Sequence, residues 1–486
     1  MTSTSTAEPP SAEGVARRRA VLIMLCLVQF MLNLDDNVVS VALPTVREDL
    51  GFGTAGLAWV VNGYILAFGG LLLLFGRVAD LLGRRRVFLT GTALFGVASV
   101  FCGAAQEPWQ LVAGRFVQGT GAAMASPAAL ALLTLLYPGA RERAKAIGIW
   151  GATAAVGATS GLVISGALTG FASWRWIFLI NVPVVVVVAV LLPRAVSESR
   201  SERRPRIDLP GAVLVTCAPV LLVYGLLRAA ETGWDDVVSM VAMIAAALLA
   251  VAFVAVQRRV GEPLVPLSFL ASRPRAVANV ATLLFSASFY AMAFLLMLHL
   301  QTVLGYGPFA AGLAYLPFGA GILAGMWLSS RAVDRLGARP AIVAGLLISA
   351  SGLLLMPGID GHDAYASGVL PAFLITSLGC GMSLPALSVV ALAGTTEEDA
   401  GIGSALLTSG QQLGGAVGLA VLVTLATQRG DALADSIGAD RAATAGFSFA
   451  LTVAAAVVGV AAVLIATMLR PRAHVPAKTR HRVDLG

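Results

Sequence analysis

Two short stretches of the sequence decide the fold: residues 77–85 read Arg-Val-Ala-Asp-Leu-Leu-Gly-Arg-Arg, and residues 331–339 read Arg-Ala-Val-Asp-Arg-Leu-Gly-Ala-Arg. Both fit the pattern R-x-x-D-x-x-G-x-R and place an aspartate at Asp80 and Asp334. Each stretch follows the second apolar segment of a series of six, and the two copies are offset by 254 residues. A repeat at this distance predicts two homologous halves.

Fourteen apolar segments surround these stretches, and each is close to the roughly 20 residues that a helix needs to cross a bilayer. The segments are 20–43, 57–76, 86–104, 109–136, 144–169, 174–193, 208–228, 237–256, 276–300, 310–330, 339–357, 367–392, 401–426 and 442–469. The sequence therefore predicts an all-α polytopic membrane protein with 14 transmembrane helices.

The repeat divides this series into two six-helix halves and an inserted pair of helices. We expect a cytoplasmic N-tail at 1–19, a first half at 20–193, linkers with the two inserted helices at 194–275, a second half at 276–469 and a cytoplasmic C-tail at 470–486. Paired halves of this kind build secondary transporters, with the substrate site between the halves.

Composition excludes a soluble protein. Hydrophobic residues make up 58% of the 486 residues and charged residues 12%, against roughly 45–50% and about 25% in soluble domains. The net charge of +7 comes from basic clusters between the apolar segments. This placement is typical of a membrane protein anchored on its cytoplasmic side, so we expect the lipid bilayer, and no nucleic acid, as a partner.

The basic residues also predict the orientation. All but six of the 33 Lys and Arg residues fall in the N-tail, in every second connection or in the C-tail. The exceptions are Arg47, Arg115, Arg175, Arg228, Arg429 and Arg441. Because basic loops stay on the cytoplasmic side, we expect both termini in the cytoplasm and a multi-pass protein of the plasma (inner) membrane.

Two carboxylates and one guanidinium lie inside apolar segments. Asp35 and Asp36 are roughly 10–12 Å from the outer end of the first segment, and Arg115 is roughly 9 Å from the outer end of the fourth, at ~1.5 Å per residue. An embedded charge costs roughly 2.5–3.5 kcal/mol, which makes these residues functional candidates. The matching depths predict that Arg115 holds one aspartate ionised and that protonation breaks this attraction. A static ion pair that only joins two helices is the alternative.

A polar face of the first segment favours Asp36 as the titrating group. At 100° per residue, Asp36 shares one face with Gln29, Asn33, Asn37 and Ser40, and such a face suits a water-filled cavity. Asp35 points roughly 100–140° away from this face.

Four motifs occur together in this sequence: Gly76 to Arg86, Leu34-Asp35 to Pro44, Arg115 to Gly119, and Trp174 to Pro183. As a set they resemble the major facilitator superfamily and, within it, the fourteen-span drug:proton antiporters. The resemblance implies the major facilitator fold and proton-coupled transport, with Asp35 as the motif aspartate, nine residues before Pro44. The choice between the two aspartates stays open, and we favour Asp35 on this spacing.

The loop after the second segment is a candidate gate. Asp80 lies among arginines at a helix boundary, where a salt-bridge cluster can hold the inner side shut in one state, while glycines permit close approach and a tight turn. A solvated basic loop is the alternative. The candidate gate residues are Gly76, Asp80, Gly83, Arg84 and Arg85, with Asp334 in the second copy.

The fifth segment carries small residues that let helices pack closely. Gly157, Gly161 and Gly166 resemble the antiporter signature G-x-x-x-G-P-x-x-G-G, from which Leu162 and Ser165 depart. The departures weaken the case for antiport and leave the facilitator fold untouched. Candidates for the cavity wall are Gln29, Asn33, Asn37, Tyr64, Gln118 and Gln411. For Gln411, hydrogen bonding across helices is the alternative.

An ion gradient is the expected energy source. The two lysines, Lys145 and Lys478, both follow Ala, so the phosphate-binding loop of an ATPase is absent, and we expect no ATPase subunit, cofactor or metal. We expect a proton-coupled exporter of amphiphilic or cationic small molecules, a multidrug or antibiotic efflux pump working by alternating access.

Three other functions compete with this one. A dedicated exporter of an endogenous natural product is a close alternative. An importer is weaker, because residues 192–195 do not resemble the sugar-porter signature. An enzyme is not expected, since the prenyl-transfer pattern D-D-x-x-D fails at Val39.

Overall fold

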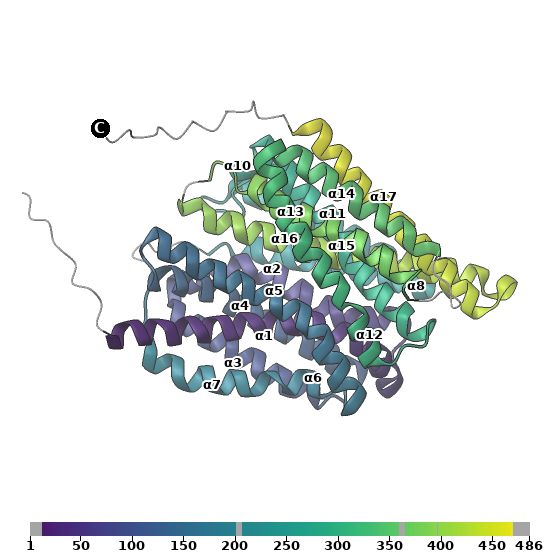
Figure 1. The fold of residues 1–486 in the computed structure, drawn as a ribbon, viewed down its shortest axis with the longest axis horizontal. Coiled ribbons are helices and arrows are strands. Elements are labelled where there is room, and N and C mark those ends of the chain that lie inside the picture. The colour runs from purple at the N-terminus through teal and green to yellow at the C-terminus, as the bar shows by residue number, and fades with distance from the viewer. Residues whose placement is uncertain (1–11, 201–206, 359–364, 396, 470–486) are drawn as a thin grey trace, which may run out of the picture.

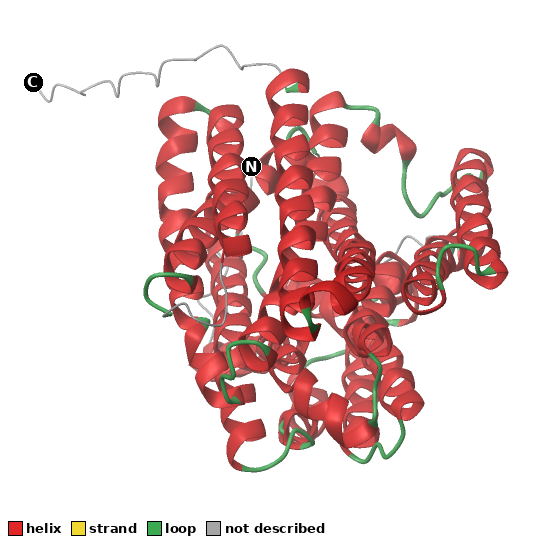
Figure 2. Cartoon of the chain, turned by 90° about the vertical axis from the view of Figure 1, so that its right-hand side faces the viewer, coloured by secondary structure: helices red, strands yellow, loops and turns green. Residues whose placement is uncertain are grey.

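The computed structural model describes residues 12–200, 207–358, 365–395 and 397–469. Within these residues the chain is helical and contains no strand (Figure 2). The helices of the first part are α1 (Ala12–Leu50), α2 (Thr54–Leu82), α3 (Arg84–Gly103), α4 (Pro108–Leu136), α5 (Ala140–Phe171), α6 (Trp176–Leu179), α7 (Asn181–Ala195), α8 (Leu209–Thr232), α9 (Val237–Arg259) and α10 (Leu267–Leu270). Those of the second part are α11 (Arg273–Thr302), α12 (Pro308–Ala314), α13 (Leu316–Leu336), α14 (Ala338–Leu355), the 3-10 helix η1 (Met356–Gly358), α15 (Val369–Ala391), α16 (Glu397–Ile437) and α17 (Ala439–Met468).

Thirteen helical segments of the described residues are long and apolar enough to cross a membrane. They correspond to the predicted spans from 57–76 onward, with α6 and α7 forming one segment and α12 and α13 another. The predicted first span, 20–43, lies within α1 and is outside this set of thirteen. The all-α polytopic prediction is confirmed. The predicted C-tail 470–486, and the N-tail up to residue 11, lie outside the described residues.

Several helices run well beyond the predicted spans. α1 begins at Ala12 and ends at Leu50, and α16 continues to Ile437. The apolar pattern records only the part of a helix that lies in hydrocarbon, whereas the hydrogen bonds along the helix continue as long as the backbone permits. Apolar segments therefore predicted the number and order of the helices better than their ends.

The helices form two packed sets that lie against each other, with α1 to α7 on one side and α11 to α17 on the other (Figure 1). In the first set α4 packs against α2 and α3, and α5 against α1. In the second set α15 packs against α13 and α14, and α16 against α11 and α17. The two sets meet where α2 contacts α16, α5 contacts α12 and α1 contacts α11.

The repeated loop has the same backbone turn in both copies. Gly83, between α2 and α3, has φ 115°, and Gly337, between α13 and α14, has φ 88°. Positive φ is strained for residues with a Cβ, so glycine is required at this turn. The turn from α2 to α3 and the turn from α13 to α14 therefore both depend on a glycine with positive φ.

A buried carboxylate joins the two inserted helices to each other and to the linker that follows them. Asp208 caps α8 by accepting a hydrogen bond from Gly211 N at 2.8 Å, and it also accepts from Gln257 Nε2 on α9 at 2.5 Å and Leu264 N at 3.2 Å. α8 packs against α9 and lies across both α2 and α16. The inserted hairpin therefore contacts both sets of helices.

Small residues set the spacing between α5 and its neighbours. A Cβ on Gly157 would lie 2.7 Å from Phe30 O, and one on Gly161 would lie 3.1 Å from Leu34 O, both on α1. A Cβ on Gly166 would lie 2.6 Å from Pro308 O at the start of α12. α5 thus contacts α1 at two glycines and the second set of helices at the third.

The spacing of α5 from α1 is testable with one methyl group. Gly157→Ala should lower the thermal unfolding temperature of the detergent-purified protein by a few degrees, because overpacking a tight contact costs about 1–3 kcal/mol. Gly148→Ala on the same helix is the matched control, since a Cβ there would meet no atom within 4 Å. Equal unfolding temperatures for the two variants would contradict close packing at Gly157.

Candidate functional site

A buried ion pair lies at the centre of the first set of helices. Arg115 Nη1 on α4 donates to Asp35 Oδ2 on α1 at 2.5 Å, and the two side chains are 1% and 0% exposed. The structure thereby brings together two of the three residues that the sequence predicted to match in depth. The third, Asp36, lies outside this pair.

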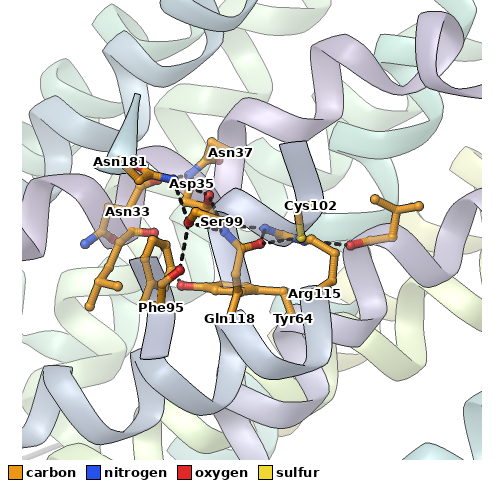
Figure 3. Close-up of polar contacts among 12 residues, drawn as sticks. Asn33, Asp35, Asn37, Tyr64, Phe95, Ser99, Cys102, Arg115, Gln118 and Asn181 are labelled. Carbon is orange, nitrogen blue, oxygen red and sulfur yellow. Dashed lines mark hydrogen bonds and ion pairs between the residues drawn. The ribbon is translucent and has the colours of Figure 1, made fainter. Parts of the chain in front are cut away.

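Two amides complete the surroundings of Asp35. Its Oδ1 accepts from Asn181 Nδ2 of α7 at 2.9 Å and from Gln118 Nε2 of α4 at 3.2 Å. Gln118 also donates to Ser99 Oγ of α3 at 2.8 Å. Figure 3 shows these side chains converging on Asp35 from α1, α3, α4 and α7. Because all three partners of Asp35 donate to it, the arrangement suits an ionised carboxylate that accepts at both oxygens.

Arg115 is held by further contacts that fix its position. Its Nε donates to Val60 O of α2 at 2.9 Å, and its Nη1 also donates to Gln118 Oε1 at 3.0 Å. The guanidinium carbon lies 4.5 Å from the ring centre of Tyr64 and 5.9 Å from that of Phe178. These contacts compensate in part for removing the cation from water.

Asp36 faces the opposite way, toward the second set of helices. The hydroxyl of Tyr290 on α11 lies 3.1 Å from Asp36 Oδ2 and 2.6 Å from Gln412 Oε1 on α16. The 100° spacing along α1 explains this separation, because neighbouring residues of a helix cannot share a direction. The two aspartates therefore lie in two different environments.

A small cavity of about 90 Å³ lies between the two sets of helices, and α1, α5, α11 and α13 contribute to its wall. Asn37 and Ser40 provide polar groups, whereas Phe289, Tyr315 and Phe318 make an aromatic side. Pockets for drug-sized ligands have volumes of about 300–1,000 Å³. The cavity is smaller than pockets of this kind.

The predicted cavity residues are divided between several places. Asn37 lines the cavity, while Tyr64 and Gln118 belong to the Asp35 cluster instead. Asn33 Nδ2 donates to the Gln29 carbonyl at 2.8 Å, and Gln29 Oε1 is buried without a hydrogen-bond partner. On α16, Gln412 contacts Tyr290, whereas Gln411 is half-buried beside it.

The first copy of the repeated loop is tied to the linker that follows α7. Asp80 accepts from Arg84 Nη2 at 2.8 Å. Glu198 accepts from the backbone N of Arg85 at 3.1 Å and of Arg86 at 3.2 Å, and its carboxylate lies within 4 Å of both guanidinium groups. A carboxylate at a helix N-terminus is stabilising, so Glu198 anchors the start of α3.

Two residues of this region escaped the sequence analysis. Glu198 lies in a linker with no motif around it, and Asp208 carries no signal beyond the N-cap preference for aspartate. Arg77 of the repeated loop donates to the carbonyls of Glu262, at 2.9 Å, and Pro263. The next residue, Leu264, donates its backbone N–H to Asp208. Asn181 of the Asp35 cluster falls within a quoted motif, but only the fold shows which group it contacts.

The second copy of the loop is less constrained. Asp334 is exposed, and no ion pair of Asp334 occurs in the described part of the chain. The Arg331 guanidinium lies over the ring of Trp327, 3.3 Å from its centre, and Arg339 donates to the Ala466 carbonyl. Gly76, which Ser330 replaces in the second copy, lies near Pro127 of α4.

The two sets of helices are joined at the end opposite these loops. Gln301 Nε2 on α11 donates to Val41 O on α1 at 2.9 Å, and the rings of Phe171 and Phe309 are 5.1 Å apart. Arg175 and Trp174 hydrogen-bond Asp49 and hold the pKa of that carboxyl below its usual value. Toward the loop end of α5, a Cβ added to Gly148 or Gly151 would meet no atom within 4 Å.

Comparison with known proteins identifies the family to which this chain is similar. Residues 25–419 match the model of the Major Facilitator Superfamily. The chain is 38% identical over 475 residues to the puromycin resistance protein pur8 of Streptomyces alboniger, covering 95% of this chain and 93% of the relative. It is also 38% identical over 423 residues to the lincomycin resistance protein of Streptomyces lincolnensis, covering 85% and 86%.

The fold is similar to that of a bacterial homologue of the human lysosomal transporter Spinster, with a TM-score of 0.67 at 16% sequence identity, over 92% of this chain and 96% of the other. The family match, the relatives and the shared architecture agree with one another. The chain belongs to the Major Facilitator Superfamily, whose members are multi-pass membrane transporters that carry small molecules, and not enzymes.

Proposed function

We propose that this chain is a proton-coupled exporter of amphiphilic or cationic small molecules, including antibiotics. The observation that carries the proposal is the Asp35–Arg115 pair, a titratable carboxylate buried among four helices of a transporter fold. The names of the relatives, which refer to resistance to puromycin and lincomycin, support export as the direction. The basic loops support a plasma-membrane location with both termini in the cytoplasm.

Protonation of Asp35 is the coupling step of this proposal. A proton on Asp35 removes the negative charge that Arg115 faces at 2.5 Å and converts one carboxylate oxygen into a donor. Three groups that donate to Asp35 then compete for fewer acceptors, and Arg115 is left as a buried cation. Because the cluster joins α1, α3, α4 and α7, relief of this imbalance requires those helices to move relative to one another.

The two ends of the interface between the two sets of helices differ in their contacts, and this difference supports alternating access. The joined end, with Gln301 on Val41 and Phe171 on Phe309, corresponds to the outer side under the proposed orientation. The opposite end carries the repeated loops, where Asp80 and Glu198 hold the arginines. We assign this conformation to the state in which the outer side is closed.

The energy source is testable in cells. A host that lacks its own pumps and expresses this chain should resist compounds from a panel of antibiotics and cationic dyes. A protonophore should abolish the efflux while cellular ATP is maintained, because the proposed coupling step is protonation of Asp35 and the sequence has no phosphate-binding loop of an ATPase. Efflux against a gradient in ATP-supplied vesicles without an ion gradient would refute proton coupling.

The partner of Arg115 is testable by a double-mutant cycle on unfolding free energy. Asp35→Asn and Arg115→Gln should each cost about 3–5 kcal/mol, because each leaves the other group buried and unpaired. The double variant should be more stable than the sum predicts, by about 0.5–3 kcal/mol. The matched cycle of Asp36→Asn with Arg115→Gln should be additive within about 0.5 kcal/mol. Coupling of similar size in both cycles would remove Asp35 as the specific partner.

The two loop aspartates should differ in importance. Asp80→Asn removes the acceptor of Arg84, whereas Asp334 is exposed and makes no ion pair within the described residues. Asp80→Asn should therefore lower the transport rate, measured as dye efflux at equal expression, several-fold more than Asp334→Asn. Equal losses would argue against Asp80 as the principal gate element.

A further inference from the structure

Asp36 has too few hydrogen-bond donors for its two carboxylate oxygens. Its Oδ1 is buried without a partner, and its Oδ2 shares the Tyr290 hydroxyl, at 3.1 Å, with Gln412 Oε1, at 2.6 Å. A hydroxyl has one proton and can satisfy one of these two acceptors. The group of three side chains therefore offers more acceptors than donors.

Asp36 also has no counter-charge in direct contact with it. Among the residues that the structure describes, no cation lies within ion-pair distance of Asp36. Arg115, the cation of this region, donates its hydrogen bonds to Asp35, Gln118 and the Val60 carbonyl. An embedded carboxylate requires either a proton or a positive charge. The site is short of a hydrogen-bond donor for Asp36 Oδ1 and of a cation in contact with the carboxylate.

The position of Asp36 suits a ligand that lies between the halves. Tyr290 follows Asp36 by 254 residues, the same offset as between the repeated loops, so the two side chains come from equivalent places on equivalent helices. They meet where α1 contacts α11. The Tyr290 ring lies against α16, where a Cβ on Gly415 would come within 2.6 Å of it.

An aromatic wall lies close by. Asn37 and Ser40, the next polar residues on the same face of α1, line the cavity between the halves. Phe289, Tyr315 and Phe318 form the other side of this cavity, and the ring centres of Phe289 and Tyr290 are 6.0 Å apart. A charged group at Asp36 would thus lie next to an aromatic surface.

We propose that Asp36, with Tyr290 and Gln412, is the subsite for a protonated amine of the exported molecule, and that the aromatic body of that molecule lies against Phe289, Tyr315 and Phe318. An ammonium group supplies both the positive charge and the N–H donors that the site lacks. The inference rests on the proposed function and narrows its substrate class to aromatic compounds that carry a basic amine. Asp35 and Asp36 then have separate tasks, one for the proton and one for the substrate.

A matched pair of fluorescent probes tests the subsite. Daunorubicin carries a protonated primary amine, and N-acetyldaunorubicin has the same aromatic body without the charge. Binding is measured by fluorescence anisotropy on the purified full-length protein at neutral pH without an ion gradient. The wild-type protein should bind the amine at least about tenfold more tightly than its acetylated form, and Asp36→Asn should remove this preference.

Two variants separate ligand binding from a structural role of Asp36. Tyr290→Phe should keep the preference for the amine, because the carboxylate remains. Loss of the preference in Tyr290→Phe as complete as in Asp36→Asn would mean that the Tyr290–Asp36 contact, and not the charge of Asp36, sets the preference, and it would overturn the proposal. Asp49→Asn, which removes an exposed carboxylate from the same helix, is the control and should leave the preference unchanged.

Other outcomes would also overturn the proposal. They are equal affinity of the wild-type protein for the two probes, no binding of either probe, or an unchanged preference in Asp36→Asn. Because the measurement uses no gradient, it is independent of the protonophore experiment. A failure of proton coupling and a failure of this subsite are therefore distinguishable.

Discussion

The ion pair between Asp35 and Arg115 is the constraint on which the first half of the protein depends. Each charge alone would cost roughly 2.5–3.5 kcal/mol at the centre of a membrane-spanning helix. Together, at 2.5 Å and with amide donors from Gln118 and Asn181, they are compensated. This compensation requires α1, α4 and α7 to keep one relative position. A change in the charge of Asp35 would therefore change how these helices pack against one another.

The repeat makes the two halves similar in backbone and different in chemistry. The offset that relates the loops places Phe289 at the position of Asp35 and Tyr290 at the position of Asp36. The second half thus has an aromatic ring where the first half has its buried charge, and Phe289 packs against Phe285 and Phe318. The buried ion pair is confined to one half, while the equivalent position in the other half contributes to the aromatic wall of the cavity.

The inserted hairpin and the linkers hold the loop end of the protein. Glu198 accepts a hydrogen bond at the start of α3 and lies beside an arginine of the first loop. Asp208 accepts from the backbone of Leu264, close to the Glu262 carbonyl to which Arg77 donates. These carboxylates come from segments outside the repeat, and among the residues that the structure describes no carboxylate forms an ion pair with the arginines of the second loop. The two copies of the motif are consequently unequal in their surroundings, although their glycine turns are alike.

The sequence by itself determined the membrane setting, the order of the helices and the repeat, because apolar length and motif spacing are local properties of the chain. It also brought Asp35 and Arg115 to the same depth. Only the tertiary structure decided which aspartate meets Arg115, since a rotation of 100° per residue sends Asp35 and Asp36 to different neighbours. The other partners of the two aspartates, Gln118, Asn181 and Tyr290, come from helices far apart in sequence. Their meeting depends on how the helices pack, and no local pattern records that.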